Sequence, residues 1–137
     1  MGPEPLSPSF SAASLARACR GKKAAIKVTL LDQKVVGGLG NIYASEALHH
    51  ARLSPLKSAS TIAAPGGAPR KSAVQLAASI KAVLANAIRR SESPYRHGRF
   101  RVYDRAGKPC LRKDCAGKIR QITQAARSTF YCPICQK

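Results

Sequence analysis

Four of the five cysteines have the spacing of metal ligands. Cys110, Cys115, Cys132 and Cys135 form the pattern C-x4-C-x16-C-x2-C. Each short pair can offer two thiolates to one ion, and the spacer suits a hairpin, so the pattern predicts one tetrahedral, structural Zn²⁺ with no open position. Two disulfides or four unrelated thiols are the alternatives, but nothing in the sequence indicates an oxidising compartment. Cys19 lies in a helix-like run and is predicted to be a small buried hydrophobic residue.

A glycine-rich segment, Gly38-Leu39-Gly40-Asn41, is the second candidate for chemistry. Glycines let backbone amides approach a ligand closely, and a helix that starts at Asn41 would point its positive end at the same place. These features predict an anion pocket, and a plain interhelical turn with a capping asparagine is an equally good interpretation. The pattern G-x-G-x-x-G is absent, which argues against dinucleotide binding.

The chain is strongly basic. Its 137 residues hold 24 Lys and Arg against 6 Asp and Glu, a formal net charge of +18. Self-repulsion of this size destabilises a compact state unless a partner relieves it, so we expect a polyanion, DNA or RNA, as partner. The alternative is a solvated basic surface that only maintains solubility. Arg112, Lys113 and Lys118 would also offset the net charge of about −2 that four thiolates leave around zinc.

Several other classes of protein do not fit the sequence. The acids are scattered, so a magnesium carboxylate cluster or a glycosidase pair is not expected. No run of about 18 apolar residues predicts a transmembrane span, and residues 1–5 lack the features of a secretory signal. An apolar content of 45% argues against disorder. We therefore expect a soluble, intracellular, globular protein without a membrane partner.

The elements that must position these residues are mainly helices. Helical patterns cover residues from Ser11 or Ser14 to about 19, 24–33, 42–51 after an Asn41 cap, and 71–90, where a broad apolar face includes Val74 and Ile88. Residues 58–70 read as a loop. Strands are predicted at 100–103, 118–123 and 128–131, with Arg127 at the tip of the last hairpin. The expected fold is mainly α with a small β-hairpin zinc finger, divided into residues 1–92 and 99–137.

Two segments resemble a known family. Residues 30–48, LLDQKVVGGLGNIYASEAL, resemble the helix–two-turn–helix segment of formamidopyrimidine-DNA glycosylases, bacterial enzymes that excise oxidised purines. Residues 127–136, RSTFYCPICQ, resemble their C-terminal zinc finger, and residues 2–6 resemble the linker before the helical domain. The resemblance implies a helix–two-turn–helix domain, one structural Zn²⁺ held by the four cysteines, and double-stranded, damaged or abasic DNA as partner.

The resemblance also implies roles for individual residues. Asn41 matches the asparagine that binds a phosphate beside the lesion, with Gly38 and Gly40 in the same DNA-binding turn. Lys27 matches the lysine that reaches this site, and Lys23 matches a DNA-contacting lysine. Arg127 matches the zinc-finger arginine that grips the flanking phosphates and that the family credits with a catalytic role in δ-elimination.

The family's nucleophile, the amine of an N-terminal proline on a β-rich domain, has no counterpart in the matched segments. Pro3-Glu4 matches the linker and is not expected to replace that proline. Residues 91–98 are shorter than the family's lesion-covering loop and unlike it. Enzyme activity is thus uncertain, and we expect a monomeric DNA-binding module in the bacterial cytoplasm, associated with the nucleoid.

Three alternatives stay open. A separate polypeptide could supply the N-terminal catalytic half. The chain could be an active glycosylase or a residual abasic-site lyase that uses the amine of Gly2 or Lys27. It could also be an RNA-binding zinc ribbon, because isoleucyl-tRNA synthetases carry a similar finger.

Overall fold

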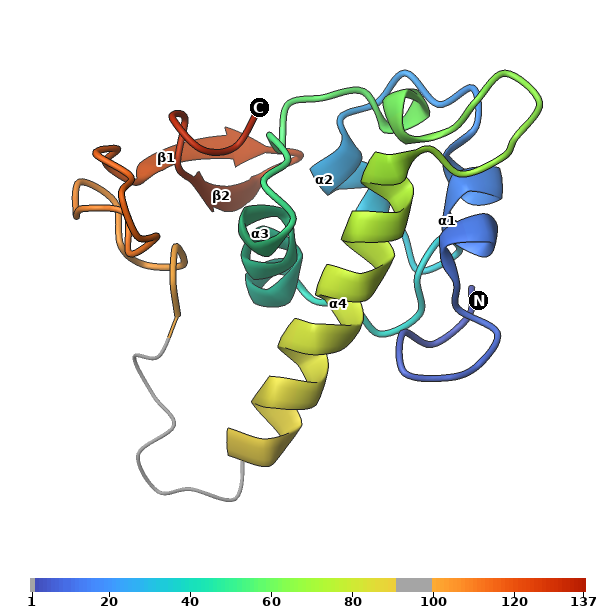
Figure 1. The fold of residues 1–137 in the computed structure, drawn as a ribbon, viewed down its shortest axis with the longest axis horizontal. Coiled ribbons are helices and arrows are strands. Elements are labelled where there is room, and N and C mark those ends of the chain that lie inside the picture. The colour runs from blue at the N-terminus through green and yellow to red at the C-terminus, as the bar shows by residue number, and fades with distance from the viewer. Residues whose placement is uncertain (1, 91–99) are drawn as a thin grey trace.

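The computed structural model describes residues 2–90 and 100–137, so the prediction for residues 91–98 lies outside the described residues. The fold is mainly helical with one two-stranded antiparallel sheet, which confirms the predicted class. Figure 1 shows the hairpin and α1 on opposite sides of α3 and α4. The elements are α1 (Ala12–Cys19), α2 (Ile26–Leu30), α3 (Asn41–His50), the 3₁₀ turn η1 (Ala59–Ile62), α4 (Lys71–Arg90), β1 (Arg120–Gln124) and β2 (Arg127–Tyr131).

The helical part of the molecule is held together by one apolar core. α4 packs against both α1 and α3, and side chains such as Leu15, Leu48 and Ile80 are completely buried between them. On α4 the predicted apolar face is wrong at Val74 and Ile88, which are exposed, and the buried face also includes Ala73. None of the described helices is both long and apolar enough to cross a membrane.

α1 begins and ends as the sequence predicts. Ser11 is the N-cap: the Ser14 amide donates to Ser11 Oγ at 3.1 Å, and the Ser11 amide donates to Ser14 Oγ at 2.9 Å. This reciprocal pair satisfies two amides that the first turn would leave without partners. Cys19 at the other end of the helix is fully buried, and burial raises the pKa of its thiol to about 11. Its prediction as a buried hydrophobic residue is confirmed.

α2 is shorter than the predicted helix over residues 24–33. The Asp32 carboxylate accepts a hydrogen bond from the Lys34 amide at 2.9 Å, and the Asp32 carbonyl accepts from the amides of Val35 and Val36. Asp forms such local turns readily, which ends the helix at Leu30. The loop at 58–70 likewise contains the short turn η1.

The predicted cap of α3 is wrong. Gly40 is the N-cap residue, Asn41 is the first residue of the helix, and no side chain caps this end. The Asn41 side chain instead contacts Lys27 and the carbonyl of Ser128. A charged donor makes a stronger hydrogen bond than a helix amide does, so the Asn41 side chain accepts from Lys27 and does not cap the helix.

The strand predicted at 100–103 is also wrong. The alternation of Phe100-Arg101-Val102-Tyr103 puts Val102 in the second, smaller core, but the segment pairs with no strand. Its backbone amides donate to the carboxylate of Glu46 on α3 instead. A strand needs a neighbour for these donors, and here a side chain takes them.

The zinc-finger hairpin has the register that positions Arg127. β1 and β2 pair from Arg120 opposite Tyr131 to Gln124 opposite Arg127. The two-residue turn is Ala125-Ala126, with φ of 48° and 64°, the left-handed pair that matches the twist of a tight hairpin. Arg127 therefore lies directly after the turn as the first residue of β2, and it is exposed.

Candidate metal centre and nucleic-acid interface

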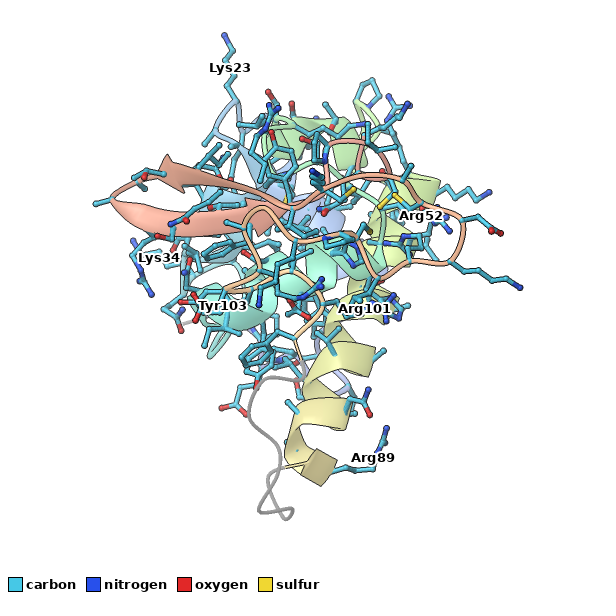
Figure 2. All side chains as sticks on the ribbon, turned by 90° about the vertical axis from the view of Figure 1, so that its left-hand side faces the viewer. Lys23, Lys34, Arg52, Arg89, Arg101 and Tyr103 are labelled. Carbon is cyan, nitrogen blue, oxygen red and sulfur yellow. The ribbon has the colours of Figure 1, made fainter. Side chains whose placement is uncertain are left out.

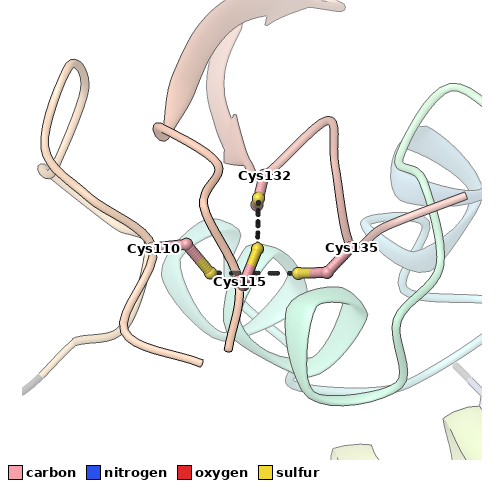
Figure 3. A group of neighbouring side chains, drawn as sticks. All are labelled: Cys110, Cys115, Cys132 and Cys135. Carbon is pink, nitrogen blue, oxygen red and sulfur yellow. Dashed lines mark hydrogen bonds between the residues drawn. The ribbon is translucent and has the colours of Figure 1, made fainter. Parts of the chain in front are cut away.

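The four predicted zinc ligands meet at one point. The sulfurs of Cys110, Cys115, Cys132 and Cys135 all lie within 4.8 Å of one another (Figure 3). Two of the separations are 3.8 Å, between Cys110 and Cys135, and 3.7 Å, between Cys115 and Cys132. A tetrahedron of thiolates at the usual Zn–S distance of about 2.3 Å has edges of about 3.8 Å. The separations fit one zinc ion and are far longer than the S–S bond of a disulfide.

Close backbone packing builds the two arms of the cluster. The Cys110 amide donates to the carbonyl of Gly117 at 2.8 Å, which folds the first cysteine pair into a loop. A Cβ atom on Gly117 would lie 2.5 Å from Cys132 Sγ, so only glycine lets the two arms approach this closely. In the second arm, Gln136 Oε1 accepts from the Cys132 amide at 2.7 Å, and Gln136 Nε2 donates to the carbonyl of Leu53 at 2.9 Å.

Two side chains act as polar neighbours of the sulfurs. Arg112 Nε donates to Cys135 Sγ at 3.3 Å, while its NH2 group donates to the His49 carbonyl. His49 Nε2 lies 3.4 Å from Cys110 Sγ, and burial, with a smaller effect of Arg112 and other nearby cations, lowers the pKa of His49 to about 3. The neutral imidazole can donate one N–H to a thiolate. Arg112 offsets thiolate charge as predicted, whereas neither Lys113 nor Lys118 contacts a sulfur.

The second constellation joins the helices to the hairpin. Lys27 Nζ donates to Asn41 Oδ1, and Asn41 Nδ2 donates to the carbonyl of Ser128 at 2.9 Å. Lys27 Nζ also lies 3.4 Å from the same carbonyl. Lys27 is 0% exposed, and burial, with a smaller effect of Arg127, lowers the pKa of its ammonium to about 8. Residues from α2, α3 and β2 thus meet beside the exposed Arg127.

The remaining predicted contact residues lie outside this constellation. Gly38 has a φ of 80°, which favours glycine, but its amide donates to Gln33 Oε1 at 2.7 Å. Gly40 is exposed at the start of α3, and none of the described residues accepts from its amide. Lys23 contacts neither Lys27 nor Arg127, and Figure 2 shows its side chain extending away from the body of the molecule.

Some residues that build the site carry no sequence signal. The Ser128 acceptor is a backbone carbonyl, which any residue could supply. His49 and Gln136 are residue types that occur in many structural roles, so only the folded structure shows that they contact the cysteine cluster. Glu46 is different, because an acid within a helix of a protein this basic could have been singled out.

Within the described residues, acidic side chains do not neutralise the cationic surface. In residues 2–90 and 100–137 we find no Lys or Arg within ion-pair distance of an Asp or Glu side chain, although the chain has a formal charge of +18. Cations that no acidic side chain neutralises keep their attraction for anions.

Comparisons with known proteins cover both parts of the chain. The family model "Formamidopyrimidine-DNA glycosylase H2TH domain" matches residues 1–97, and the model "Zinc finger found in FPG and IleRS" matches residues 107–137. With the four-cysteine cluster, this makes the metal centre a structural zinc site.

Curated relatives named formamidopyrimidine-DNA glycosylase match the whole chain. Those of Afipia carboxidovorans and of a strain of Rhodopseudomonas palustris are 48% and 49% identical over 100% of this chain, which covers 51% of each relative. The chain thus spans about half the length of the curated relatives it matches.

Solved structures give the same result. The Lactococcus lactis enzyme, non-covalently bound to DNA that contains an AP site, has a TM-score of 0.86 and 34% identity, over 100% of this chain and 50% of that chain. MutM from Thermus thermophilus has a TM-score of 0.81 and 31% identity, over 99% of this chain and 53% of that chain. The chain belongs to the formamidopyrimidine-DNA glycosylase family.

Proposed function

We propose that this chain is a module that binds double-stranded DNA at damaged or abasic sites, and that it does not excise bases on its own. The meeting of Lys27, Asn41 and Ser128 beside the exposed Arg127 carries this proposal. Asn41 uses one N–H on Ser128 and keeps a second for a phosphate oxygen. Arg127 offers the planar donor fork that suits phosphates. Similar solved structures hold DNA that contains an AP site or carbocyclic 8-oxo-G, which supports the choice of ligand.

The zinc site supports this function by fixing Arg127. We propose Cys110, Cys115, Cys132 and Cys135 as the four ligands. A zinc ion there contributes folding energy and no reactive position, because its coordination is complete. The N-terminal end of α3, with Gly38 and Gly40 before it, adds positive potential that attracts the phosphate backbone. The exposed Lys23 adds further positive potential.

The first test is a titration of a labelled abasic duplex at several salt concentrations. If about six cations contact phosphates, the logarithm of the affinity falls with the logarithm of salt with a slope of about −5. An intact duplex and a tRNA serve as competitors. Equal affinity for tRNA and duplex DNA would favour an RNA-binding zinc ribbon instead.

We predict that Arg127→Ala weakens duplex binding about tenfold and reduces the salt slope by about one, because one phosphate contact is lost. The measurement is fluorescence anisotropy of the labelled duplex. Arg120→Ala is the matched control, since Arg120 is an exposed arginine at the other end of the same hairpin. If both variants change the slope equally, Arg127 has no special position in the interface.

We predict that duplex affinity declines as the pH rises through about 8, the pKa to which burial lowers Lys27. Below this pH the ammonium charge attracts phosphate, and above it the charge is lost. Lys27→Met should remove this part of the decline, whereas Lys23→Met, which keeps Lys27, should retain it. The measurement is duplex titration at constant ionic strength between pH 6.5 and 9.5. Identical pH profiles for the wild type and Lys27→Met would contradict the assignment of the decline to Lys27.

The lowered pKa of Lys27 also favours one second candidate, a residual abasic-site lyase. An unprotonated amine can attack the aldehyde of an opened abasic sugar, lose water and form a Schiff base, with Arg127 then placed to assist δ-elimination. Borohydride would trap this adduct. We expect no trapping with the chain alone, because Lys27 Nζ is buried behind Asn41 and Ser128. Trapping only after addition of a separate N-terminal half would identify a split enzyme.

The proposed partners and location follow from the family. We propose a monomer that binds DNA of the bacterial nucleoid, in the cytoplasm, and that excises bases only together with the family's proline nucleophile. Sedimentation of the free chain, and of the chain with duplex, tests whether the protein is a monomer in each state.

A further inference from the structure

Glu46 is the one described acid that is buried. It lies on α3, five residues after Asn41, and is only 8% exposed, whereas Glu4, Asp32, Asp104 and Asp114 are exposed. Burying an ionised carboxylate is costly unless charges or several hydrogen bonds stabilise it. The zinc site and the proposed phosphate contacts leave this residue without a role.

The partners of Glu46 are backbone amides of a distant segment. Oε1 accepts from the Arg101 amide at 2.8 Å, and Oε2 accepts from the amides of Val102 and Tyr103 at 2.9 and 3.0 Å. No described Lys or Arg pairs with the carboxylate, although cations are abundant. Three consecutive backbone donors define a position more strictly than one flexible lysine would. The contact therefore fixes where the segment 100–103 lies on α3.

The segment held by Glu46 is packed between α3 and β2. A row of edge-to-face aromatic contacts runs from Tyr43 on α3 through Phe100 and Tyr103 to Phe130 on β2, with centroid distances of 6.1, 5.7 and 5.0 Å. Val102 within the segment is fully buried in the core beside the cysteines. Phe130 is buried and the other three rings are half-buried, so the direct ring contacts couple the position of the segment to that of β2.

Phe130 lies two residues after Ser128, on the strand that begins with Arg127. The carbonyl of Ser128 lies over Asn41 and Lys27 only when β2 has this position relative to α3. The route from Glu46 to the phosphate-binding groups thus runs through the 101–103 amides, Tyr103 and Phe130.

We propose that Glu46 is a positioning residue that seats the zinc-finger hairpin on α3 and so sets Arg127 in register with Asn41 for binding of the DNA backbone. This inference rests on the proposed function. It makes a prediction whose sign is opposite to that of simple electrostatics. Removal of a negative charge from a DNA-binding protein ordinarily strengthens binding, whereas loss of the Glu46 contact should weaken it.

The experiment is a double-mutant cycle of Glu46→Gln and Arg127→Ala, read by duplex affinity and salt slope. We expect Glu46→Gln alone to weaken binding about tenfold and reduce the slope by about one, with one zinc per chain retained, since the displaced Arg127 contact is lost. When Glu46→Gln is added to Arg127→Ala, we expect duplex affinity to fall by less than about twofold. Asp104→Asn is the matched control: it removes the same charge from an exposed acid next to the segment, so binding should stay equal or become tighter.

Equal losses in both backgrounds, or tighter binding by Glu46→Gln, would overturn the inference. Absence of duplex binding by the wild-type chain would instead overturn the proposed function, so the two failures are distinguishable. If Glu46→Gln loses its zinc, Tyr103→Leu provides the second variant, because it leaves the carboxylate contact and removes the edge contact with Phe130. Tyr103→Leu should reproduce the reduced slope, and a folded Tyr103→Leu with wild-type affinity and slope would overturn the route.

Discussion

Removal of zinc is expected to unfold the hairpin and to weaken duplex binding by at least about tenfold. The core around the cysteines contains few large side chains, chiefly Val102, Ile119 and Phe130. A core of this size stabilises a fold poorly, whereas a structural zinc site contributes about 10 kcal/mol or more of apparent binding free energy. Without the metal, four thiols lie close together with no common partner, and Arg127 loses its fixed place beside Asn41.

The measurement is a chelator titration with three readouts on one sample: released zinc, duplex anisotropy and amide NMR dispersion. We expect signals of residues 107–137 to collapse, while α1 and α4 keep theirs because they share a separate core. Cys132→Ser should behave like the chelated protein. Cys19→Ser makes the same chemical change outside the cluster and should retain one zinc per chain. A hairpin with native dispersion after complete zinc loss would contradict the structural role.

Local signals explain what the sequence predicted well. The cysteine pattern places the metal centre because ligand spacing is itself the geometric requirement. The serine pair that caps α1 and the tight hairpin turn each involve residues within four positions of one another, and both lie where predicted. In such segments the competing conformations are few, so residue type nearly decides the structure.

Two of the errors arise where a distant group takes over a local hydrogen bond. Residues 100–103 alternate like a strand, yet the amides of residues 101–103 donate to Glu46, 55 to 57 residues away in the chain. Asn41 has the residue type of a helix cap, yet its side chain bonds to Lys27 and to Ser128. These partners cannot be inferred from spacing, because each contact depends on how a distant segment packs on α3.

The contact with Lys27 gives Asn41 a role in folding as well as in phosphate binding. Phosphate binding alone would make Asn41 dispensable for folding, as expected of a surface ligand. The structure makes it also the acceptor for the buried ammonium of Lys27. We therefore expect Asn41→Ala both to weaken duplex binding and to lower the free energy of unfolding by about 2 kcal/mol, since a buried charged donor would lose a partner.

Two companion variants separate these effects, measured by urea unfolding and duplex titration. Asn41→Ala combined with Lys27→Met removes the uncompensated charge, so stability should recover while affinity stays low. Asn41→Asp gives Lys27 an anionic partner but repels phosphate, so it should retain stability and lose binding more severely than Asn41→Ala. If Asn41→Ala is as stable as the wild type and the double variant gains nothing further, Lys27 does not depend on Asn41. Opposite responses of stability and affinity to Asn41→Asp would instead establish that one side chain serves both the fold and the phosphate, because only the fold tolerates the added charge.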